Sequence, residues 1–287
     1  PRIGDQIKKA KNFFNKAIKA NNYKGEYHYC YCTKCCHFSH VIEEALEHNV
    51  HLETSSSFDI DIIRILEAKG KINKNTILIQ NGHKTEDYLN KIVGLMEDGF
   101  TNVIPVLDSK QELDRFYSKT KGDLTIGIRM AINEEPQSAY YTSRLGIRSA
   151  EILDFYKSKI AKKKRVKVKM LHFFVDSGIK DNLYYWGEFR KALKLFAELK
   201  KICPTLDSIN LGGGLPIRNN LGFEYDYKYM INELVTNIKE VCQEEGIEEP
   251  DIYTEFGKYT VGESGAIIFS VLEQKQQNDS ELWYLID

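Results

Sequence analysis

The sequence predicts an α/β fold, a (β/α)8 barrel followed by the start of a β-rich domain. Short apolar runs alternate with segments of helical periodicity eight times along the chain. This alternation is typical of parallel strands, each followed by a covering helix. The rival arrangement is an open, doubly wound sheet. No glycine-rich nucleotide-binding fingerprint follows the first predicted strand, which favours the barrel.

The predicted strands are short, apolar and bounded by turn residues. They cover Tyr27–Thr33, Val50–Glu53, Thr76–Gln80, Asn102–Leu107, Leu124–Met130, Val166–Val175, Asp207–Leu211 and Asp251–Glu255. Helical periodicity lies between them. The predicted helices cover Phe38–His48, Phe58–Lys69, Glu86–Asp98, a segment from Lys110, a segment from Ser149, Trp186–Ile202 and Tyr227–Glu245.

The predicted barrel occupies residues 1–262. Residues 263–287 contain two further apolar runs, Ile267–Leu272 and Leu282–Ile286, on either side of a polar stretch. Two apolar runs around a polar turn are typical of a β-hairpin. We therefore predict that residues 263–287 begin a C-terminal β-domain that this sequence does not complete.

Composition excludes several classes of partner. The formal net charge is -1, which gives no general attraction to nucleic acid or to anionic membranes. No run approaches the ~20 apolar residues of a membrane span, and no signal-peptide pattern follows Pro1. Four of the six cysteines lie in residues 30–36, and Cys35 and Cys36 are adjacent, which is unsuited to disulfides. We expect a cytoplasmic protein that acts on a small molecule.

Lys34 directly follows the first predicted strand. In a (β/α)8 barrel the chemistry lies at the carboxyl ends of the strands, so this lysine is placed at the barrel mouth. Burial there lowers the pKa of a lysine amine and makes it a candidate for Schiff-base formation. The alternative is an ordinary solvated lysine.

Three consecutive glycines, Gly212, Gly213 and Gly214, follow the seventh strand. Without side chains, their backbone N–H groups can approach an anion closely. Phosphate sites of such barrels lie after strands seven and eight. The stretch is therefore either a phosphate-binding loop or a plain turn.

Glu255 ends the eighth strand, and Gly257 and Lys258 follow it. A carboxylate in the barrel mouth requires a cationic partner, either a structural lysine or arginine or a protonated ring nitrogen. Lys258 adds positive charge beside the glycine loop. An amine, a phosphate loop and a carboxylate together match the aldehyde, phosphate and pyridine nitrogen of pyridoxal 5'-phosphate (PLP).

These residues also carry a family resemblance. The chain resembles the barrel domain of fold-type III PLP enzymes, the group of alanine racemase and ornithine decarboxylase, and within it most resembles the biosynthetic arginine decarboxylases. The shared motifs, in chain order, are Tyr31–Lys34, Leu52–Ser56, Asn81–Lys84, Gly127–Arg129, Ser143–Gly146, Gly212–Gly214 and Thr254–Lys258. Asn81–Lys84 matches the turn that distinguishes the arginine enzymes.

The resemblance implies an alanine-racemase-like barrel in which Lys34 carries PLP and, with Glu255, is catalytic. It also implies a set of cofactor-binding residues: Lys34, Glu53, Arg129, Phe174, Ser177, Gly212, Gly213, Gly214, Glu255, Gly257 and Lys258. The implied reaction converts L-arginine to agmatine, a step of polyamine biosynthesis, in a homodimer or higher homo-oligomer. Mg²⁺ is associated with the arginine family, but the sequence shows no ligand set for it.

Two departures from the family pattern stand out. After the sixth strand, the histidine that stacks on the cofactor ring is replaced by Phe174, and a phenyl ring can still stack. His172 matches the preceding histidine, and we expect it to point the opposite way. The family also places a Cys-Asp pair in a C-terminal β-domain, and the sequence stops before that region. We therefore interpret the chain as a fragment of a longer enzyme.

Three alternatives stay open from sequence alone. The first alternative is that the substrate is ornithine, lysine or diaminopimelate instead of arginine, because the chemistry at the cofactor ring is the same for all four. A second alternative is a barrel that binds PLP without decarboxylating. The third is a metal site in the histidine- and cysteine-rich segment from His28 to His40, against which Cys30 and Cys32 are predicted to be buried strand residues.

Overall fold

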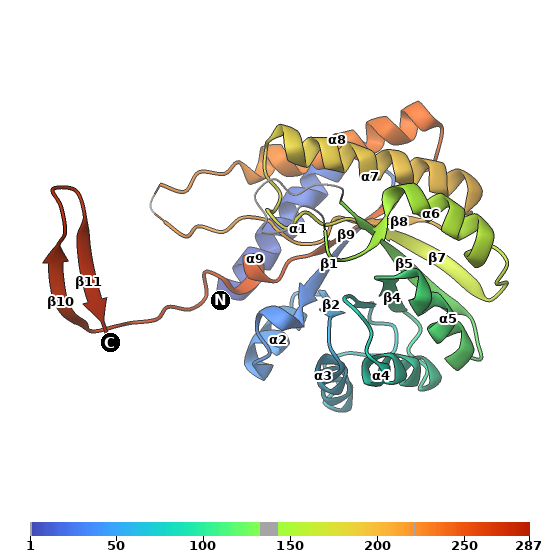
Figure 1. Cartoon of the computed structure of the whole chain (residues 1–287), viewed down its shortest axis with the longest axis horizontal. Helices are drawn as coiled ribbons and strands as arrows, with labels where there is room; N and C mark the ends of the chain where they lie inside the picture. Colours follow the sequence, from blue (N-terminus) through green and yellow to red (C-terminus); the bar gives the residue numbers. More distant parts are fainter. Residues whose placement is uncertain (1, 133–142, 221) are drawn as a thin grey trace.

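The computed structural model describes residues 2–132, 143–220 and 222–287. In these residues eight parallel strands close into a barrel, which confirms the predicted fold class (Figure 1). In chain order the barrel strands are β1 (Tyr27–Cys32), β2 (His51–Thr54), β3 (Leu78–Gln80), β4 (Val103–Leu107), β5 (Leu124–Ala131), β7 (Val166–His172), β8 (Ser208–Asn210) and β9 (Asp251–Glu255). β1 pairs with β9 and β4 with β5, so the sheet has no gap, and the two-residue strand β6 (Ile147–Arg148) pairs with β5 outside the ring.

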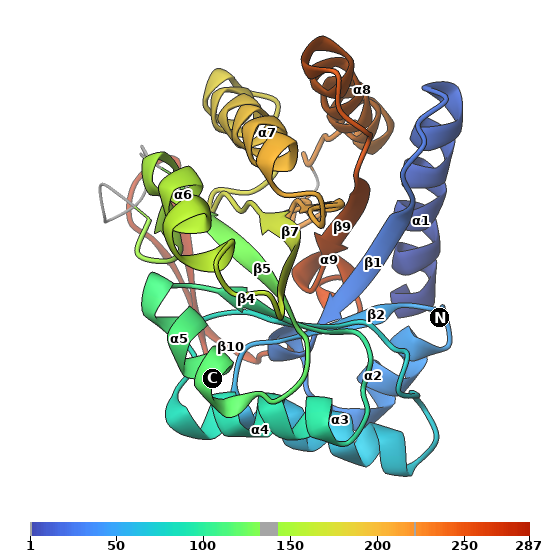
Figure 2. The same ribbon diagram turned by 90° about the vertical axis from the view of Figure 1, so that its right-hand side faces the viewer.

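Helices cover the outside of the barrel, as Figure 2 shows. They are α2 (Ser39–Leu46), α3 (Ser57–Ala68), α4 (Glu86–Glu97), α5 (Lys110–Lys119), α6 (Ser149–Phe155), α7 (Leu183–Ile202), α8 (Tyr227–Glu245) and α9 (Lys258–Val261), with a π-helical turn over Tyr156–Ile160 after α6. Polar residues fix where several of them begin. Ser56 and Asp59 form a reciprocal capping box on α3, and Asn182 and Asp226 cap α7 and α8.

A helix that the sequence analysis did not predict precedes the first strand. α1 (Arg2–Ala20) buries Ile7, Ala10, Phe14 and Ala17, which recur at helical spacing. It packs against α8, α9 and β1, and Phe14 stacks on Tyr27 with ring centroids 4.0 Å apart. α1 therefore covers the seam where the first and last barrel strands pair.

The barrel interior is apolar at mid-height. Cys30, Ile79, Ile104, Val106, Met170 and Tyr253 form one buried cluster from alternating positions on five strands. The same alternation, continued toward the carboxyl ends, points a set of polar side chains into the mouth. The strand register sets these residues beside one another: Cys32 pairs with Glu53, Arg129 with His172, and His172 with Asn210.

The C-terminal segment forms an antiparallel hairpin, β10 (Val271–Gln276) and β11 (Leu282–Ile286), which lies away from the barrel (Figure 1). Its apolar side chains are exposed, including Leu272 and Trp283. The hairpin agrees with the predicted strand content, and the assignment of residues 263–287 to a separate β-domain stays a prediction. None of the helices within the described residues has the length and apolar character needed to cross a membrane.

Candidate cofactor site at the carboxyl ends of the strands

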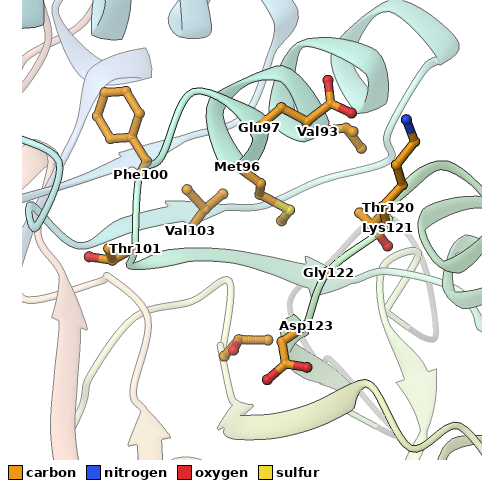
Figure 3. Close-up of a pocket in the computed structure, with 11 residues that line it drawn as sticks. Val93, Met96, Glu97, Phe100, Thr101, Val103, Thr120, Lys121, Gly122 and Asp123 are labelled. Carbon is orange, nitrogen blue, oxygen red and sulfur yellow. The ribbon is translucent and has the colours of Figure 1, made fainter.

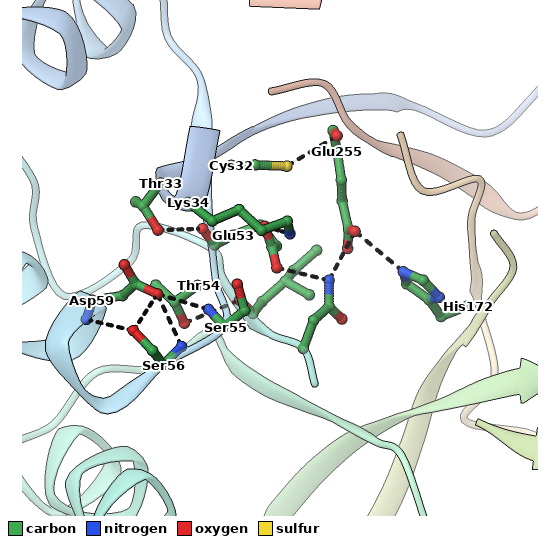
Figure 4. Close-up of polar contacts among 12 residues, drawn as sticks. Cys32, Thr33, Lys34, Glu53, Thr54, Ser55, Ser56, Asp59, His172 and Glu255 are labelled. Atoms are coloured by element: carbon green, nitrogen blue, oxygen red, sulfur yellow. Dashed lines mark hydrogen bonds and ion pairs between the residues drawn. The ribbon is translucent and has the colours of Figure 1, made fainter. Parts of the chain in front are cut away.

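Lys34 lies in a one-turn 3-10 helix, Thr33–Cys35, directly after β1. Its side chain is about half exposed, and Nζ lies 2.5 Å from Oε2 of Glu53. Thr33 holds the turn against β2 by donating its hydroxyl to the Glu53 carbonyl at 3.0 Å. Figure 4 shows the Lys34 side chain extended beside Glu53 and toward Glu255. The turn after β1 thus directs the amine into the mouth.

The prediction that the pKa of Lys34 is lowered is wrong for this arrangement. Desolvation does lower the pKa of Lys34, but Cys32 and the carboxylates of Glu53 and Glu255 raise it, and the net pKa is raised. Burial also raises the pKa of the Cys32 thiol well above its ordinary value, so Cys32 is neutral at pH 7. The two carboxylates are therefore the groups that keep Lys34 protonated.

Glu53 and Glu255 share one amide. Asn81 Nδ2 donates to Oε1 of Glu53 at 3.0 Å and to Oε2 of Glu255 at 2.8 Å. Glu53 is completely buried and Glu255 nearly so. Two buried carboxylates repel each other, and the shared donor together with the Lys34 ammonium offsets that repulsion.

Glu255 accepts two further hydrogen bonds. Asn210 Nδ2 donates to Oε1 at 2.7 Å, and His172 Nε2 lies 3.2 Å from Oε2. Burial raises the pKa of Glu255, but His172, Lys34 and Asn81 lower it, and the net pKa lies below its ordinary value. Among the described residues the Glu255 carboxylate is held by two amides and a histidine, and its side chain has no ion pair with a lysine or arginine.

His172 points into the barrel, which contradicts the predicted direction of its side chain. Residues 172 and 174 are two apart, so they share a strand face as long as the strand continues. β7 was predicted to reach Val175 but ends at His172, and Phe174 lies in the loop that follows. The Phe174 ring lies 5.4 Å from Cζ of Arg129. His172 therefore contacts the carboxylate, while Phe174 lies between Arg129 and the glycine loop.

The glycine loop has the backbone conformation that its residues allow. Gly212 and Gly214 have φ values of +64° and +102°, and a Cβ on Gly213 would lie 2.7 Å from the Glu255 carbonyl oxygen. Gly212 is internally bonded, because its N–H donates to Asn210 Oδ1 at 2.8 Å and its carbonyl accepts the Glu255 N–H at 2.8 Å. In the described residues no partner is seen for the Gly213 and Gly214 N–H groups, which leaves two donors for an anion.

The loop after β7 packs on the glycine loop. Ile179 N–H donates to the Gly214 carbonyl at 3.0 Å, and a Cβ on Gly178 would meet that carbonyl oxygen at 2.7 Å. Ser177, partly exposed, immediately precedes this contact. It therefore lies near the loop that the sequence analysis assigned to a phosphate.

Gly257 and Lys258 follow β9. A Cβ on Gly257 would overlap Cys35 Sγ and lie 2.9 Å from Cys32 Cβ, so only glycine lets β9 approach the turn that carries Lys34. Lys258 is exposed at the first residue of α9. The predicted set thus gathers at one end of the barrel, with Lys258 at its solvent edge.

The Asn81–Lys84 motif divides into two parts. Asn81 belongs to the site, whereas Lys84 is completely buried and pairs with Glu112 Oε2 at 3.4 Å and with the Val106 carbonyl. Burial lowers the pKa of Lys84. Lys84 therefore anchors the loop after β3 to the end of β4, which keeps Asn81 in place.

Three residues of the network, Asn81, His172 and Asn210, had no role in the site predicted for them from the sequence. The available signal was positional, because each is a polar residue at or just beyond a strand end and shares the inward face with Glu255 through the strand register. For the histidine- and cysteine-rich segment, the described residues contain no group of three or more metal-ligand side chains arranged around a common point.

Comparison with known proteins gives a consistent result. A family model described as the pyridoxal-binding domain of pyridoxal-dependent decarboxylases matches residues 5–262. The chain is 28% identical over 291 residues to the biosynthetic arginine decarboxylase of Prochlorococcus marinus (strain MIT 9215), which covers 94% of this chain and 44% of that protein. The chain thus spans less than half the length of this relative.

Solved structures show the same fold. The biosynthetic arginine decarboxylase of Campylobacter jejuni superposes with a TM-score of 0.76 at 24% identity, over 96% of this chain and 46% of that one. The diaminopimelate decarboxylase of M. jannaschii gives a TM-score of 0.77 at 18% identity, over 99% of this chain and 66% of that one.

Proposed function

The chain belongs to the pyridoxal-dependent decarboxylase family through its pyridoxal-binding domain, and we propose that it acts in the PLP-dependent decarboxylation of a basic amino acid, L-arginine to agmatine. The observation that carries the proposal is that the Lys34 amine, two loop N–H groups with no partner among the described residues and the buried Glu255 carboxylate lie around one barrel mouth. These three groups fit the aldehyde, phosphate and ring nitrogen of PLP.

Bound PLP supplies an electron sink for the pair left on the substrate Cα when CO₂ departs. The bond between Cα and the carboxyl carbon breaks, and a proton takes the place of CO₂. Glu255 is suited to hold a protonated ring nitrogen, because it is ionised and already oriented. An ionised carboxylate offers about four acceptor positions, and Glu255 uses one on Oε1 and two on Oε2. One position on Oε1 is left for the ring N–H.

Lys34 must lose a proton before its amine can bond to the cofactor. The acceptor nearest to its Nζ is Oε2 of Glu53 at 2.5 Å. We assign Glu53 the tasks of holding the Lys34 amine in the mouth and of accepting its proton. The paired amide of Asn81 keeps the Glu53 carboxylate in position for both.

The remaining predicted residues have supporting positions. The N–H groups of Gly213 and Gly214 bind the phosphate, and Ser177 and Lys258 assist at the rim. Phe174, backed by Arg129, provides a flat surface on which the ring stacks. Gly257 allows β9 to approach the Lys34 turn.

Arginine as substrate rests on the relatives' names and on the Asn81–Lys84 motif. Lysine, ornithine or diaminopimelate is the alternative, and the M. jannaschii diaminopimelate decarboxylase shows that the same barrel fold serves another of these substrates. A barrel that binds PLP without decarboxylating is the second alternative.

We also propose that the protein is cytoplasmic and forms a homodimer or higher homo-oligomer. Cell fractionation tests its location, and analytical ultracentrifugation tests its oligomeric state.

The first experiment asks whether Lys34 carries the cofactor. The chain is mixed with PLP, reduced with borohydride, digested and mapped, and the label is expected on the peptide containing Lys34. Lys34→Ala should lose the label, whereas Lys258→Ala should retain it with a weaker affinity for PLP. A label on any other peptide contradicts the assignment.

The second experiment identifies the reaction. Because the chain spans less than half the length of its arginine decarboxylase relative, we expect no CO₂ release from the chain alone, and the assay uses the full-length protein. CO₂ release is measured from carboxyl-labelled arginine, ornithine, lysine and diaminopimelate, with Lys34→Ala as the matched negative. Arginine is expected to give the highest kcat/KM. Preference for another of the four corrects the substrate, and PLP binding without CO₂ release from any of them supports the non-decarboxylating alternative.

A further inference from the structure

Asn210 contacts both chemically distinct parts of the candidate cofactor site. Its Nδ2 donates to Oε1 of Glu255 at 2.7 Å, and its Oδ1 accepts the Gly212 N–H at 2.8 Å. Nδ2 also lies 3.7 Å from Met170 Sδ. One amide thus joins the carboxylate assigned to the ring nitrogen to the first residue of the loop assigned to the phosphate.

Solvent cannot replace these bonds. Asn210 is completely buried, at the last position of β8, and its backbone is fixed by pairing with β7 and β9. A buried donor or acceptor that loses its partner carries its full desolvation cost. The side chain therefore has one favourable orientation, with the carbonyl toward Gly212 and the amide nitrogen toward Glu255.

The backbone reinforces the same connection. The Glu255 N–H donates to the Gly212 carbonyl at 2.8 Å, so Gly212 is bonded to Glu255 directly and, through Asn210, to its carboxylate. With both of its polar groups occupied, Gly212 acts as the fixed base of the loop. Gly213 and Gly214, which extend from it, keep their N–H groups for the ligand.

We infer that Asn210 is a positioning residue that holds both ends of the cofactor site: its Nδ2 fixes the orientation of Glu255, and its Oδ1 fixes the first residue of the phosphate loop. This inference rests on the proposed function, because it assigns a role within that site. Removing the Asn210 amide therefore weakens recognition of the phosphate and of the ring nitrogen together, whereas a change that breaks only one of its two bonds affects the end at which that bond lies.

The test compares PLP with pyridoxal, which lacks the phosphate. The dissociation constant of pyridoxal divided by that of PLP, called the ratio below, measures what the phosphate contributes to binding. The NMR chemical shift of ¹⁵N at the ring nitrogen reports the contact with Glu255. Asn210→Ala is expected to lower the ratio about tenfold, as for one buried hydrogen bond, and to move the ¹⁵N shift. Glu255→Gln should move the ¹⁵N shift but leave the ratio within about twofold of the parent's value, a difference too small to indicate a lost hydrogen bond.

Asn237→Asp is the matched control, since Asn237 bonds within α8, donating to the Glu233 carbonyl at 2.8 Å, outside the site. It should leave both readouts unchanged. An Asn210→Ala chain that folds and keeps the parent's ratio overturns the inference, even if its ¹⁵N shift moves. A parent chain that does not bind PLP covalently overturns the proposed function itself, which separates the two failures.

A second variant covers the case in which Asn210→Ala does not fold. Asn210→Asp keeps an acceptor for Gly212 but places a carboxylate against Glu255, so it should lower thermal stability and move the ¹⁵N shift while leaving the ratio near that of the parent. The double variant Asn210→Asp with Glu255→Gln restores a hydrogen bond in which the side chain at position 255 donates and the one at position 210 accepts. Recovery of thermal stability in the double variant is expected, and its absence contradicts a direct bond between the two side chains.

Discussion

The carboxyl and amino ends of the barrel both carry polar and titratable side chains, but they arrange them differently. At the carboxyl end Glu53, Asn81, His172, Asn210 and Glu255 are buried and joined in one hydrogen-bonded network, of which Figure 4 labels Glu53, His172 and Glu255. At the amino end His28 lies 3.6 Å from Asp251 and stacks on Tyr253, and the His28 and Asp251 side chains are partly exposed. These amino-end contacts are local pairs at the solvent edge.

A pocket of about 550 Å³ lies near the amino ends of β4 and β5 (Figure 3). Its charged lining residues, Glu97, Lys121 and Asp123, are exposed, and its apolar lining comes from α4 and from the segment that leads from α4 into β4. Exposed charges bind a ligand weakly because water competes with them. Charged residues and a pocket are present at the amino end as well. What distinguishes the functional end is that its polar side chains are buried and hydrogen-bonded to one another.

The largest expected difference comes from removing one carboxylate at each end of β9. Glu255→Gln should lower kcat for decarboxylation about 10²–10³-fold, the usual cost of losing one preoriented electrostatic partner. Asp251→Asn, on the same strand at the other end, should leave kcat near that of the parent. The measurement is CO₂ release by the full-length protein under saturating substrate, and comparable losses of kcat in both variants would contradict the distinction between the two ends.

Glycine-to-alanine substitutions at the two ends should differ in their effects as well, but by less than the carboxylate substitutions. Gly213→Ala sets a Cβ 2.7 Å from the Glu255 carbonyl, and this overpacking should cost about 1–3 kcal/mol of unfolding free energy and weaken PLP binding. Gly122→Ala, before β5, meets no atom within 4 Å. Denaturant titration should show no loss for Gly122→Ala, and an equal loss in both variants contradicts the steric argument.

At the amino end we expect a pH effect on stability. Desolvation, with the nearby charges of His28 and Lys11, lowers the pKa of His51 to about 4. In the unfolded chain His51 takes up a proton near pH 6.5, so the unfolded state binds more protons between about pH 6.5 and 4, and stability falls as pH falls through that window. Because the ring is partly exposed, we expect a contribution of about 1–2 kcal/mol.

His51→Asn should flatten that part of the profile of unfolding free energy against pH. His40→Asn, at an exposed position, is the control and should leave the slope unchanged. If the slope between pH 4 and 6.5 is the same in the parent and in His51→Asn, His51 does not contribute to it.

The smallest effect is expected at the stacking surface. Phe174→His should leave PLP affinity within about tenfold, or ~1.4 kcal/mol, because either ring can stack. Fluorescence titration with PLP measures the change. A larger change in either direction would mean that residue 174 has a role beyond a flat surface.

The barrel strands were predictable because parallel strands buried on both faces give near-continuous apolar runs, such as Val103–Leu107. α1 was not predicted although Ile7, Ala10, Phe14 and Ala17 have helical spacing, because α1 lies before the strand–helix repeat, which begins with β1. The end of β7 was placed three residues late, since Phe173 and Val175 are apolar but belong to the loop.

Within the site, Lys34, the glycine loop and Glu255 could be found because each follows a strand and has distinctive chemistry. Asn210 could not be found, and Asn81 was found only as part of a family motif, because a neutral amide at a strand end is indistinguishable from a turn residue until the register shows what it faces. The raised pKa of Lys34 likewise depends on two carboxylates that are distant in sequence and adjacent only in the closed barrel.

The pairing of β1 with β9 has a consequence for how the chain folds. Cys32 donates its thiol to the Glu255 carbonyl at 3.0 Å, a contact between residues 223 positions apart. Such long-range closure is slow, since the entropy of a large loop is lost before its contacts form. Lys34 and Glu255 stand on either side of that seam, so a partly assembled barrel has no complete cofactor site. PLP capture is therefore expected to be among the last events of refolding, and its spectral change would report ring closure in real time.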